Sequence, residues 1–203
     1  MLLSFFLNVG HYSRWGLIST KGGTAVTTCF MLYLHAMSEN KIVLTSADLA
    51  EFVARNQIAA KIVHLPVQTP TVAAAADALG VSPAQIIKSV LFLADGEPVL
   101  VVARGPNRIA WKRLADYLGV SRRRLKTADA AQVLAITGYP VGAVPPFGHR
   151  QRLRTVVETA VYDQAVVYGG GGEMNALMQL RTTELRRVVG GETAELAEPS
   201  STP

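Results

Sequence analysis

The sequence predicts a single domain of the α/β class, in which helices and strands are mixed along the chain (α+β). The chain has 203 residues, of which 49% are hydrophobic, so it is long enough to bury a sizeable core. Apolar residues recur at helical spacing in some segments and cluster as strands in others, with Gly and Pro between them. Internal repeats and regular strand–helix alternation are missing, which disfavours a solenoid or a doubly wound fold.

Residues 1–36 differ in composition from the rest of the chain. Their only charged residues are Arg14 and Lys21, and their two apolar runs are each much shorter than the ~20 residues that span a bilayer. The order of charged and apolar residues also does not match a signal peptide. We expect a disordered extension, or a start of translation at Met37; a membrane-seeking anchor is the weaker alternative.

The ordered domain is expected to begin at Met37. Short polar residues before apolar residues at helical spacing predict a helix over residues 45–56. Residues 61–65 read as a strand that ends at a proline. An alanine-rich helix is predicted over residues 71–79, with a glycine where a C-terminal cap belongs, and Ser82-Pro83 opens another short helix.

The middle of the chain predicts a hairpin followed by two helices. The β-rich runs at residues 89–94 and 98–103 flank Asp95-Gly96, a strong hairpin signal. Residues 107–118 carry apolar and charged side chains on opposite faces, as an amphipathic helix does. A further helix is predicted over residues 128–136, where a glycine again ends it.

The last part of the domain combines glycine-rich segments with short strands. Residues 138–148 contain too much Gly and Pro for a helix or a central strand. Three strands and a final helix capped by Thr182 or Thr183 are expected at residues 153–158, 164–168, 174–180 and 182–189. The domain thus spans residues 37–190, and residues 191–203 form a flexible polar tail.

Charge, cysteine content and motifs exclude several classes of site. The chain carries 20 Lys and Arg against 15 Asp and Glu, a bias compatible with RNA but not diagnostic of it. The single cysteine builds neither an internal disulfide nor a thiolate zinc site, and the scattered histidines form no metal-ligand pattern. The sequence also lacks a Gly-x-Ser-x-Gly elbow and a phosphate loop. We expect no cofactor, no metal, no DNA partner and a cytoplasmic protein.

Three features remain that could carry chemistry, and each has a purely structural alternative. Lys88 lies within an apolar run, where it either points to solvent or is a partly buried cation aimed into a pocket. The glycine-rich segments 142–148 and 169–172 can offer backbone N–H groups to an oxyanion, or serve only as turns. The run Arg122–Arg124 can grip phosphates or form a solvated face.

The order of these motifs resembles a known family. Residues 72–92 read VAAAADALGVSPAQIIKSVLF and look like the helix, turn and lysine-bearing strand of YbaK/EbsC-type aminoacyl-tRNA editing domains. Gly138-Tyr139 followed by residues 142–146 (GAVPP) is similar to the family's Gly-x-x-x-Pro loop, and residues 168–175 (YGGGGEMN) resemble its glycine-rich turn. These domains are relatives of the editing insertion of bacterial prolyl-tRNA synthetase, and the resemblance covers about residues 46–189.

The resemblance implies a central mixed β-sheet flanked by helices. It also implies hydrolysis of the ester that joins a wrong amino acid to a tRNA 3′ end, acting in trans, with the tRNA for proline as one candidate. Aminoacyl-tRNA would be the substrate, prolyl-tRNA synthetase a candidate partner, and no membrane is expected. Lys88 matches the family's required lysine. The residues expected to hold the aminoacyl group are Gly142, Ala143, Val144, Pro145, Pro146, Gly170 and Gly171. Weaker candidates for tRNA contact are Arg122, Arg123, Arg124 and Arg150.

Two departures and two alternative functions stay open. Ala143 and Pro145 stand where many family members have Gly and a small hydroxyl or thiol residue, so the amino acid that is removed is not fixed by the sequence. A non-catalytic module that binds tRNA or a synthetase would keep the fold and use its basic surface instead. Hydrolysis of a small activated ester without tRNA is a third, weaker hypothesis.

Overall fold

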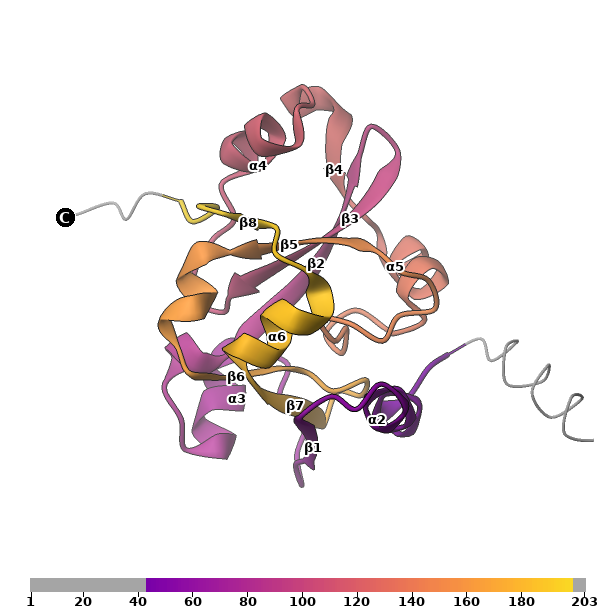
Figure 1. The fold of residues 1–203 in the computed structure, drawn as a ribbon, viewed down its shortest axis with the longest axis vertical. Coiled ribbons are helices and arrows are strands. Elements are labelled where there is room, and N and C mark those ends of the chain that lie inside the picture. The colour runs from indigo at the N-terminus through magenta and orange to yellow at the C-terminus, as the bar shows by residue number, and fades with distance from the viewer. Residues whose placement is uncertain (1–42, 199–203) are drawn as a thin grey trace, which may run out of the picture. The chain divides into compact units, whose positions relative to one another are not determined.

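The computed structural model describes residues 43–198 (Figure 1). The expected extension over residues 1–36 and the expected start at Met37 lie outside the described residues. None of the helices within residues 43–198 is both long and apolar enough to cross a membrane.

The described strands form two sheets. One is antiparallel, with the strand order β1 (Ala60–His64), β7 (Ala176–Arg181), β6 (Val166–Gly170). The other is mixed, with the order β4 (Leu125–Thr127), β2 (Ile87–Ala94), β3 (Glu97–Arg104), β5 (Arg154–Glu158), β8 (Thr193–Ala194). In it β2 pairs antiparallel with β3 and β4, whereas β5 runs parallel to β3 and to β8. The expected mixed sheet is confirmed, and the smaller sheet is an addition to it.

Helices cover both sheets and agree with most of the predicted ranges. They are α2 (Ser46–Arg55), α3 (Val72–Leu79), α4 (Trp111–Leu118), α5 (Ala130–Thr137) and α6 (Thr182–Val189). Short 3-10 turns are η1 (Pro83–Gln85), η2 (Arg122–Arg124) and η3 (Thr159–Asp163). Figure 1 shows α6 in front of the sheets, with α4 near one end of the molecule and α2 and α3 near the other.

Two helix starts differ from the prediction. The helix predicted from residue 107 begins at Trp111, because the preceding residues pair with the C-terminal segment: Ile109 bridges Ala197, and Glu198 N–H donates to Arg108 O at 2.9 Å. The last helix is capped by Arg181 rather than by a threonine. Thr182 is its first residue, and its hydroxyl donates to Gln164 O at 2.7 Å, which joins the helix to the segment before β6.

Residues 191–198, which the sequence predicts as part of a flexible tail, include a short strand and a buried residue. Thr193–Ala194 forms β8 on the edge of the mixed sheet. Leu196 is 1% exposed and its carbonyl accepts a hydrogen bond from Ala110 N–H at 2.6 Å. Strand pairing, the buried side chain of Leu196 and the ion pair of Glu192 with Arg154 therefore hold a segment whose polar composition predicts fraying.

The core consists of three clusters separated by the sheets. The largest lies between the two sheets and includes Leu49 of α2, Leu100 of β3 and Met178 of β7. A second cluster packs α4 on the outer face of the mixed sheet, and a third packs α3 beside β6 and β7. Because side chains alternate along β2, Leu91 belongs to the inner cluster and Phe92 to the outer one.

Candidate active site

Lys88 lies near the start of β2 and is half-buried. Its Nζ donates to two backbone carbonyls, Gly105 O at 3.0 Å and Asn107 O at 2.5 Å. Burial lowers the pKa of the Lys88 ammonium, an effect that the negative charge of Glu158 opposes and that Arg108 reinforces. An ammonium group has three donors, so one N–H of Lys88 remains beyond these two bonds.

Glu158 is a buried carboxylate that completes this polar cluster. It ends β5, is 2% exposed, and accepts hydrogen bonds from Arg104 N–H at 2.7 Å and from Asn107 Nδ2 at 2.6 Å. Asn107 therefore bridges Glu158 to Lys88, since its own carbonyl accepts from Nζ. Glu158 is not among the residues predicted from the sequence, where its one signal is an acidic residue at the end of an apolar strand.

The two glycine-rich segments pack directly on each other. A Cβ added at Gly170 would lie 2.7 Å from Ala143 O and would also collide with Val144 O, so only glycine fits there. Gly172 N–H donates to Ala143 O at 3.0 Å. Residues 143–147 are buried, whereas Gly142 is exposed. The expected substrate-binding residues thus form one unit, in which Gly169 and Gly170 belong to β6 and the turn begins only after them.

Strand β2 brings Lys88 to this unit. Ile86 forms a parallel bridge with Tyr168, and a Cβ added at Gly169 would lie 3.2 Å from Ile87 Cγ1 and 3.4 Å from Pro146 Cδ. Lys88 lies two residues after Ile86, and Gly170 lies two residues after Tyr168. Because positions two apart on a strand face the same side, Lys88 and Gly170 lie on the same face of the paired strands. The three motifs therefore meet where β2 adjoins β6, with the amine of Lys88 turned toward Gly105 and Asn107.

The loop is held by the buried Tyr139 and by the half-buried His149. Burial lowers the pKa of His149 to about 4, so the ring is neutral at neutral pH, and its Nε2–H donates to Pro145 O at 2.8 Å. The Tyr139 hydroxyl donates to Gly148 O at 3.1 Å, and burial raises the pKa of Tyr139. These contacts fix residues 145–148 from inside the domain.

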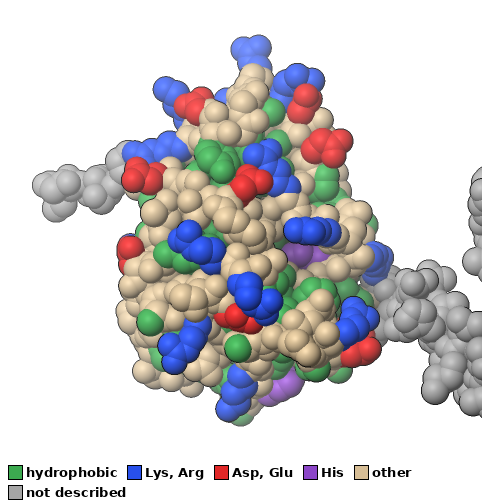
Figure 2. Space-filling view, viewed as in Figure 1, with side chains coloured by type: hydrophobic (Ala, Val, Ile, Leu, Met, Phe, Trp, Pro, Cys, Tyr) green, Lys and Arg blue, Asp and Glu red, His purple; other side chains and the backbone are tan. Residues whose placement is uncertain are grey.

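The arginines considered for tRNA contact do not form one basic patch. Arg122 stacks on the Trp111 ring at 4.0 Å, and Arg124 is ion-paired with Asp95. Arg123 is exposed next to them on η2, whereas Arg150 follows the glycine-rich loop in another part of the fold. Figure 2 shows Lys and Arg side chains scattered over the viewed face, with Asp and Glu among them.

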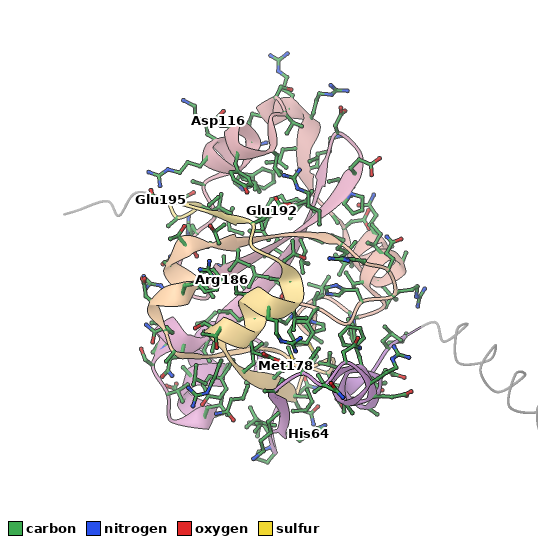
Figure 3. The ribbon with its side chains drawn as sticks, viewed as in Figure 1. His64, Asp116, Met178, Arg186, Glu192 and Glu195 are labelled. Carbon is green, nitrogen blue, oxygen red and sulfur yellow. The ribbon has the colours of Figure 1, made fainter. Side chains whose placement is uncertain are left out.

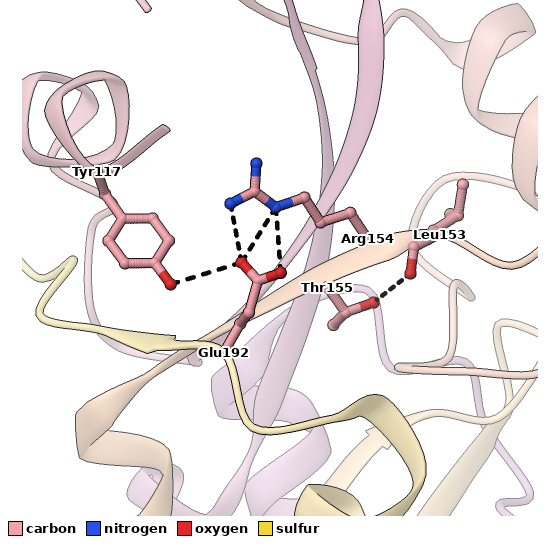
Figure 4. A network of polar contacts seen from close by, with 5 residues as sticks. All are labelled: Tyr117, Leu153, Arg154, Thr155 and Glu192. Atoms are coloured by element: carbon pink, nitrogen blue, oxygen red, sulfur yellow. Dashed lines mark hydrogen bonds and ion pairs between the residues drawn. The ribbon is translucent and has the colours of Figure 1, made fainter. Parts of the chain in front are cut away.

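Arg154 is part of a structural clamp at the C-terminal segment (Figure 4). Its Nε and Nη2 donate to Glu192 Oε2 at 3.0 and 2.9 Å, and the Tyr117 hydroxyl lies 3.5 Å from the same oxygen. The hydrogen bond to Glu192 raises the pKa of Arg154. Beside it the Thr155 hydroxyl donates to Leu153 O at 3.2 Å. Because its guanidinium is occupied by Glu192, Arg154 is a weak candidate for phosphate binding.

A serine, a histidine and a carboxylate do meet near β1, in an arrangement that does not activate the serine. Ser46 Oγ donates to Glu173 Oε2 at 2.8 Å, and His64 Nε2 lies 3.0 Å from Ser46 Oγ. The hydroxyl hydrogen of Ser46 is already used in the hydrogen bond to the Glu173 carboxylate. The imidazole of His64 can therefore only donate to Ser46 Oγ and cannot act as its base. Figure 3 shows His64 at the opposite end of the molecule from Asp116 of α4.

Taken together, the observations define a mixed α/β domain in which the strand that carries a half-buried lysine adjoins two glycine-rich segments packed on each other. Residues 67–188 match the family model described as the aminoacyl-tRNA editing domain. The chain belongs to this family.

Individual relatives agree with this assignment. Over 150 residues the chain is 31% identical to a proline–tRNA ligase of Nitratidesulfovibrio vulgaris, covering 67% of this chain and 25% of the ligase. It thus spans about a quarter of the length of that relative. The uncharacterized protein YwhH of Bacillus subtilis is 32% identical over 116 residues, which is 57% of this chain and 72% of YwhH. A solved structure described as a proposed trans-editing enzyme for prolyl tRNA synthetase matches with a TM-score of 0.71 and 28% identity, over 76% of this chain and 97% of that one.

Proposed function

We propose that the protein is a trans-acting, cytoplasmic aminoacyl-tRNA deacylase, with mischarged tRNA for proline as its first candidate substrate. One observation carries this proposal: in a member of the editing family, Lys88 and both glycine-rich segments adjoin at the β2–β6 junction. The solved structure described as a proposed trans-editing enzyme, 97% of which this chain covers, supports an action separate from a synthetase.

The chemistry needs no protein nucleophile, because an aminoacyl ester is already activated. A water molecule adds to the ester carbonyl, the bond to the ribose oxygen breaks, and free amino acid and tRNA with a free hydroxyl result. The protein must orient the ester and stabilise the negative charge that develops on the carbonyl oxygen. The terminal ribose hydroxyl or the substrate's own side chain can help to position the water.

Lys88 and the loop backbone can supply that stabilisation. The remaining N–H of Lys88 offers a cationic donor to the oxyanion or to the terminal phosphate. Among the described residues, the backbone N–H groups of Gly142 and Val144 donate to no protein acceptor, whereas Ala143 N–H donates to Pro140 O at 3.1 Å. Gly142 and Val144 are therefore the donors that we assign to the carbonyl oxygen.

Deacylation of a substrate panel tests this proposal. Ala-, Cys-, Ser- and Thr-tRNA for proline would be incubated with the full-length protein, with correctly charged Pro-tRNA as the matched control. We expect rapid loss of one or two of the mischarged esters and slow loss of the prolyl ester. Salt-sensitive tRNA binding without turnover across the panel would contradict a deacylase and favour a non-catalytic tRNA-binding module.

A further inference from the structure

A cavity lies behind the glycine-rich loop, and neither Lys88 nor Glu158 lines it. It has a volume of about 410 Å³ and is bounded by α2, by the end of α6 and by residues of the segment 146–155. We propose that this cavity binds one unpaired nucleotide from the 3′ end of the tRNA. This inference rests on the proposed function, because it assigns the cavity to the same substrate.

The cavity walls carry the groups that recognise an unpaired base. The apolar side chains in the walls are those of Phe52, Ile58, Phe147, Leu153, Val188 and Val189. The rings of Phe52 and Phe147 lie 6.1 Å apart at 31°, so together they give an aromatic surface. Asn56 and Gln151 add amide groups, and Asn56 keeps its Oδ1 as an acceptor because its Nδ2 donates to Phe52 O. Aromatic stacking combined with amide contacts to base edges is the usual mode of single-stranded RNA recognition.

One uncompensated positive charge accompanies this surface. Two arginines line the cavity, but Arg187 is already paired with Glu184 through contacts of 2.6 and 3.0 Å. Arg152 is exposed and makes no ion pair with any residue between 43 and 198. Figure 2 shows a Lys or Arg side chain beside a His side chain and hydrophobic side chains on the viewed face. A nucleotide would place its base against the apolar surface and its phosphate at the guanidinium of Arg152.

The cavity and the candidate active site share a wall. Pro146 lines the cavity, and its Cδ faces Gly169 on the other side. His149 also lines the cavity and donates to Pro145 O in the same loop. A nucleotide in the cavity would therefore contact the segment that forms the ester-binding loop. This is expected if the 3′ end of one tRNA occupies both the cavity and the candidate active site.

Kinetics with two substrates test this inference. Wild type, Arg152→Gln and the control Arg113→Gln, an exposed arginine on α4, would be compared on a mischarged aminoacyl-tRNA and on the same amino acid esterified to adenosine alone. We expect Arg152→Gln to raise KM for the tRNA about tenfold, with kcat unchanged and no effect on the adenosine ester. An equal effect on both substrates, or none on either, would overturn the inference.

Direct binding separates this inference from the proposed function. The trinucleotide CCA with a 5′ phosphate, and adenosine monophosphate as the free nucleotide, would be titrated into the protein while the His149 ring signals are followed by NMR. We expect the trinucleotide to shift these signals and Arg152→Gln to weaken its binding. Tighter binding of the mononucleotide would overturn the tRNA assignment, as would silent His149 signals. The titration does not depend on turnover, so a protein that hydrolyses neither ester but binds the trinucleotide would refute only the deacylase.

Discussion

Lys88 and the Arg122–Arg124 run are both basic, yet the fold treats them differently. The lysine is half-buried, held by Gly105 O and Asn107 O, and placed next to the buried carboxylate of Glu158. The three arginines are exposed; Arg122 stacks on Trp111 and Arg124 is ion-paired with Asp95. Both regions are conspicuous in the sequence, but only Lys88 lies on a strand, β2, that adjoins the glycine-rich segments.

This difference shows that the surroundings of a basic group, rather than its charge, decide what it can do. A cation in a partly desolvated site interacts strongly with charge that develops beside it, whereas an exposed cation is screened by water and salt. We therefore expect large effects from changes in the buried network and small effects from changes in exposed arginines.

The half-buried His149 should give the largest effect on stability. The pKa of His149 is about 4 in the folded protein and near 6.5 when unfolded, so the unfolded chain takes up the proton first as pH falls. The contribution of His149 to stability is fully present above about pH 6.5 and is lost as pH falls from 6.5 to about 4, a loss of about 3 kcal/mol. Urea unfolding at several pH values would measure this loss. His149→Gln should flatten it, and His64→Gln, on an exposed ring, should not.

Gly170→Ala should damage both stability and activity. The new Cβ would collide with the carbonyls of Ala143 and Val144, and backbone atoms cannot move aside without displacing the loop. We expect a loss of about 1–3 kcal/mol in unfolding free energy, measured by denaturation, together with slower ester hydrolysis. Gly191→Ala is the matched control, because a Cβ there meets nothing within 4 Å. Equal behaviour of the two variants would show that the loop does not need its contact with β6.

Glu158→Gln should change the pH dependence of activity more than its maximum. The negative charge of Glu158 raises the pKa of Lys88 against the effect of burial, so its removal lowers that pKa further. If the charged amine is required, activity is present below the pKa of Lys88 and is lost as pH rises through it. The alkaline fall in single-turnover rate should therefore begin at a lower pH in Glu158→Gln than in the wild type. An unchanged pH profile would show that Glu158 does not influence the titration of the catalytic amine.

Arg123→Gln should have the smallest effect. An exposed arginine contributes at most one screened phosphate contact, so tRNA affinity should fall slightly and the salt slope of binding by about one. Filter binding at several salt concentrations would measure both quantities. A collapse of affinity in this variant would contradict the contrast between the buried and the exposed basic groups.

Local signals explain how much of this structure the sequence could predict. The hairpin at Asp95-Gly96 has the positive φ angles, 56° and 90°, that its residue pair predicts. The sequence predicts a strand that stops at residue 168, before Gly169 and Gly170, because glycine has low strand propensity. Both glycines belong to β6 in the structure, where Gly170 allows the close approach of the Ala143 and Val144 carbonyls. The link from Asn107 to Glu158 joins residues 51 apart, and the anchor at Leu196 depends on the distant α4 region, so no local pattern could show either.

The rate of ester hydrolysis under single-turnover conditions tests the role of Lys88 most directly. Lys88→Met keeps most of the apolar stem and removes the charge, and excess protein over mischarged tRNA separates the chemical step from binding. We predict a fall in rate of about 10²–10³-fold, with tRNA affinity and unfolding midpoint close to wild type. A rate within a few fold of wild type in a folded Lys88→Met protein would contradict a catalytic role for this lysine.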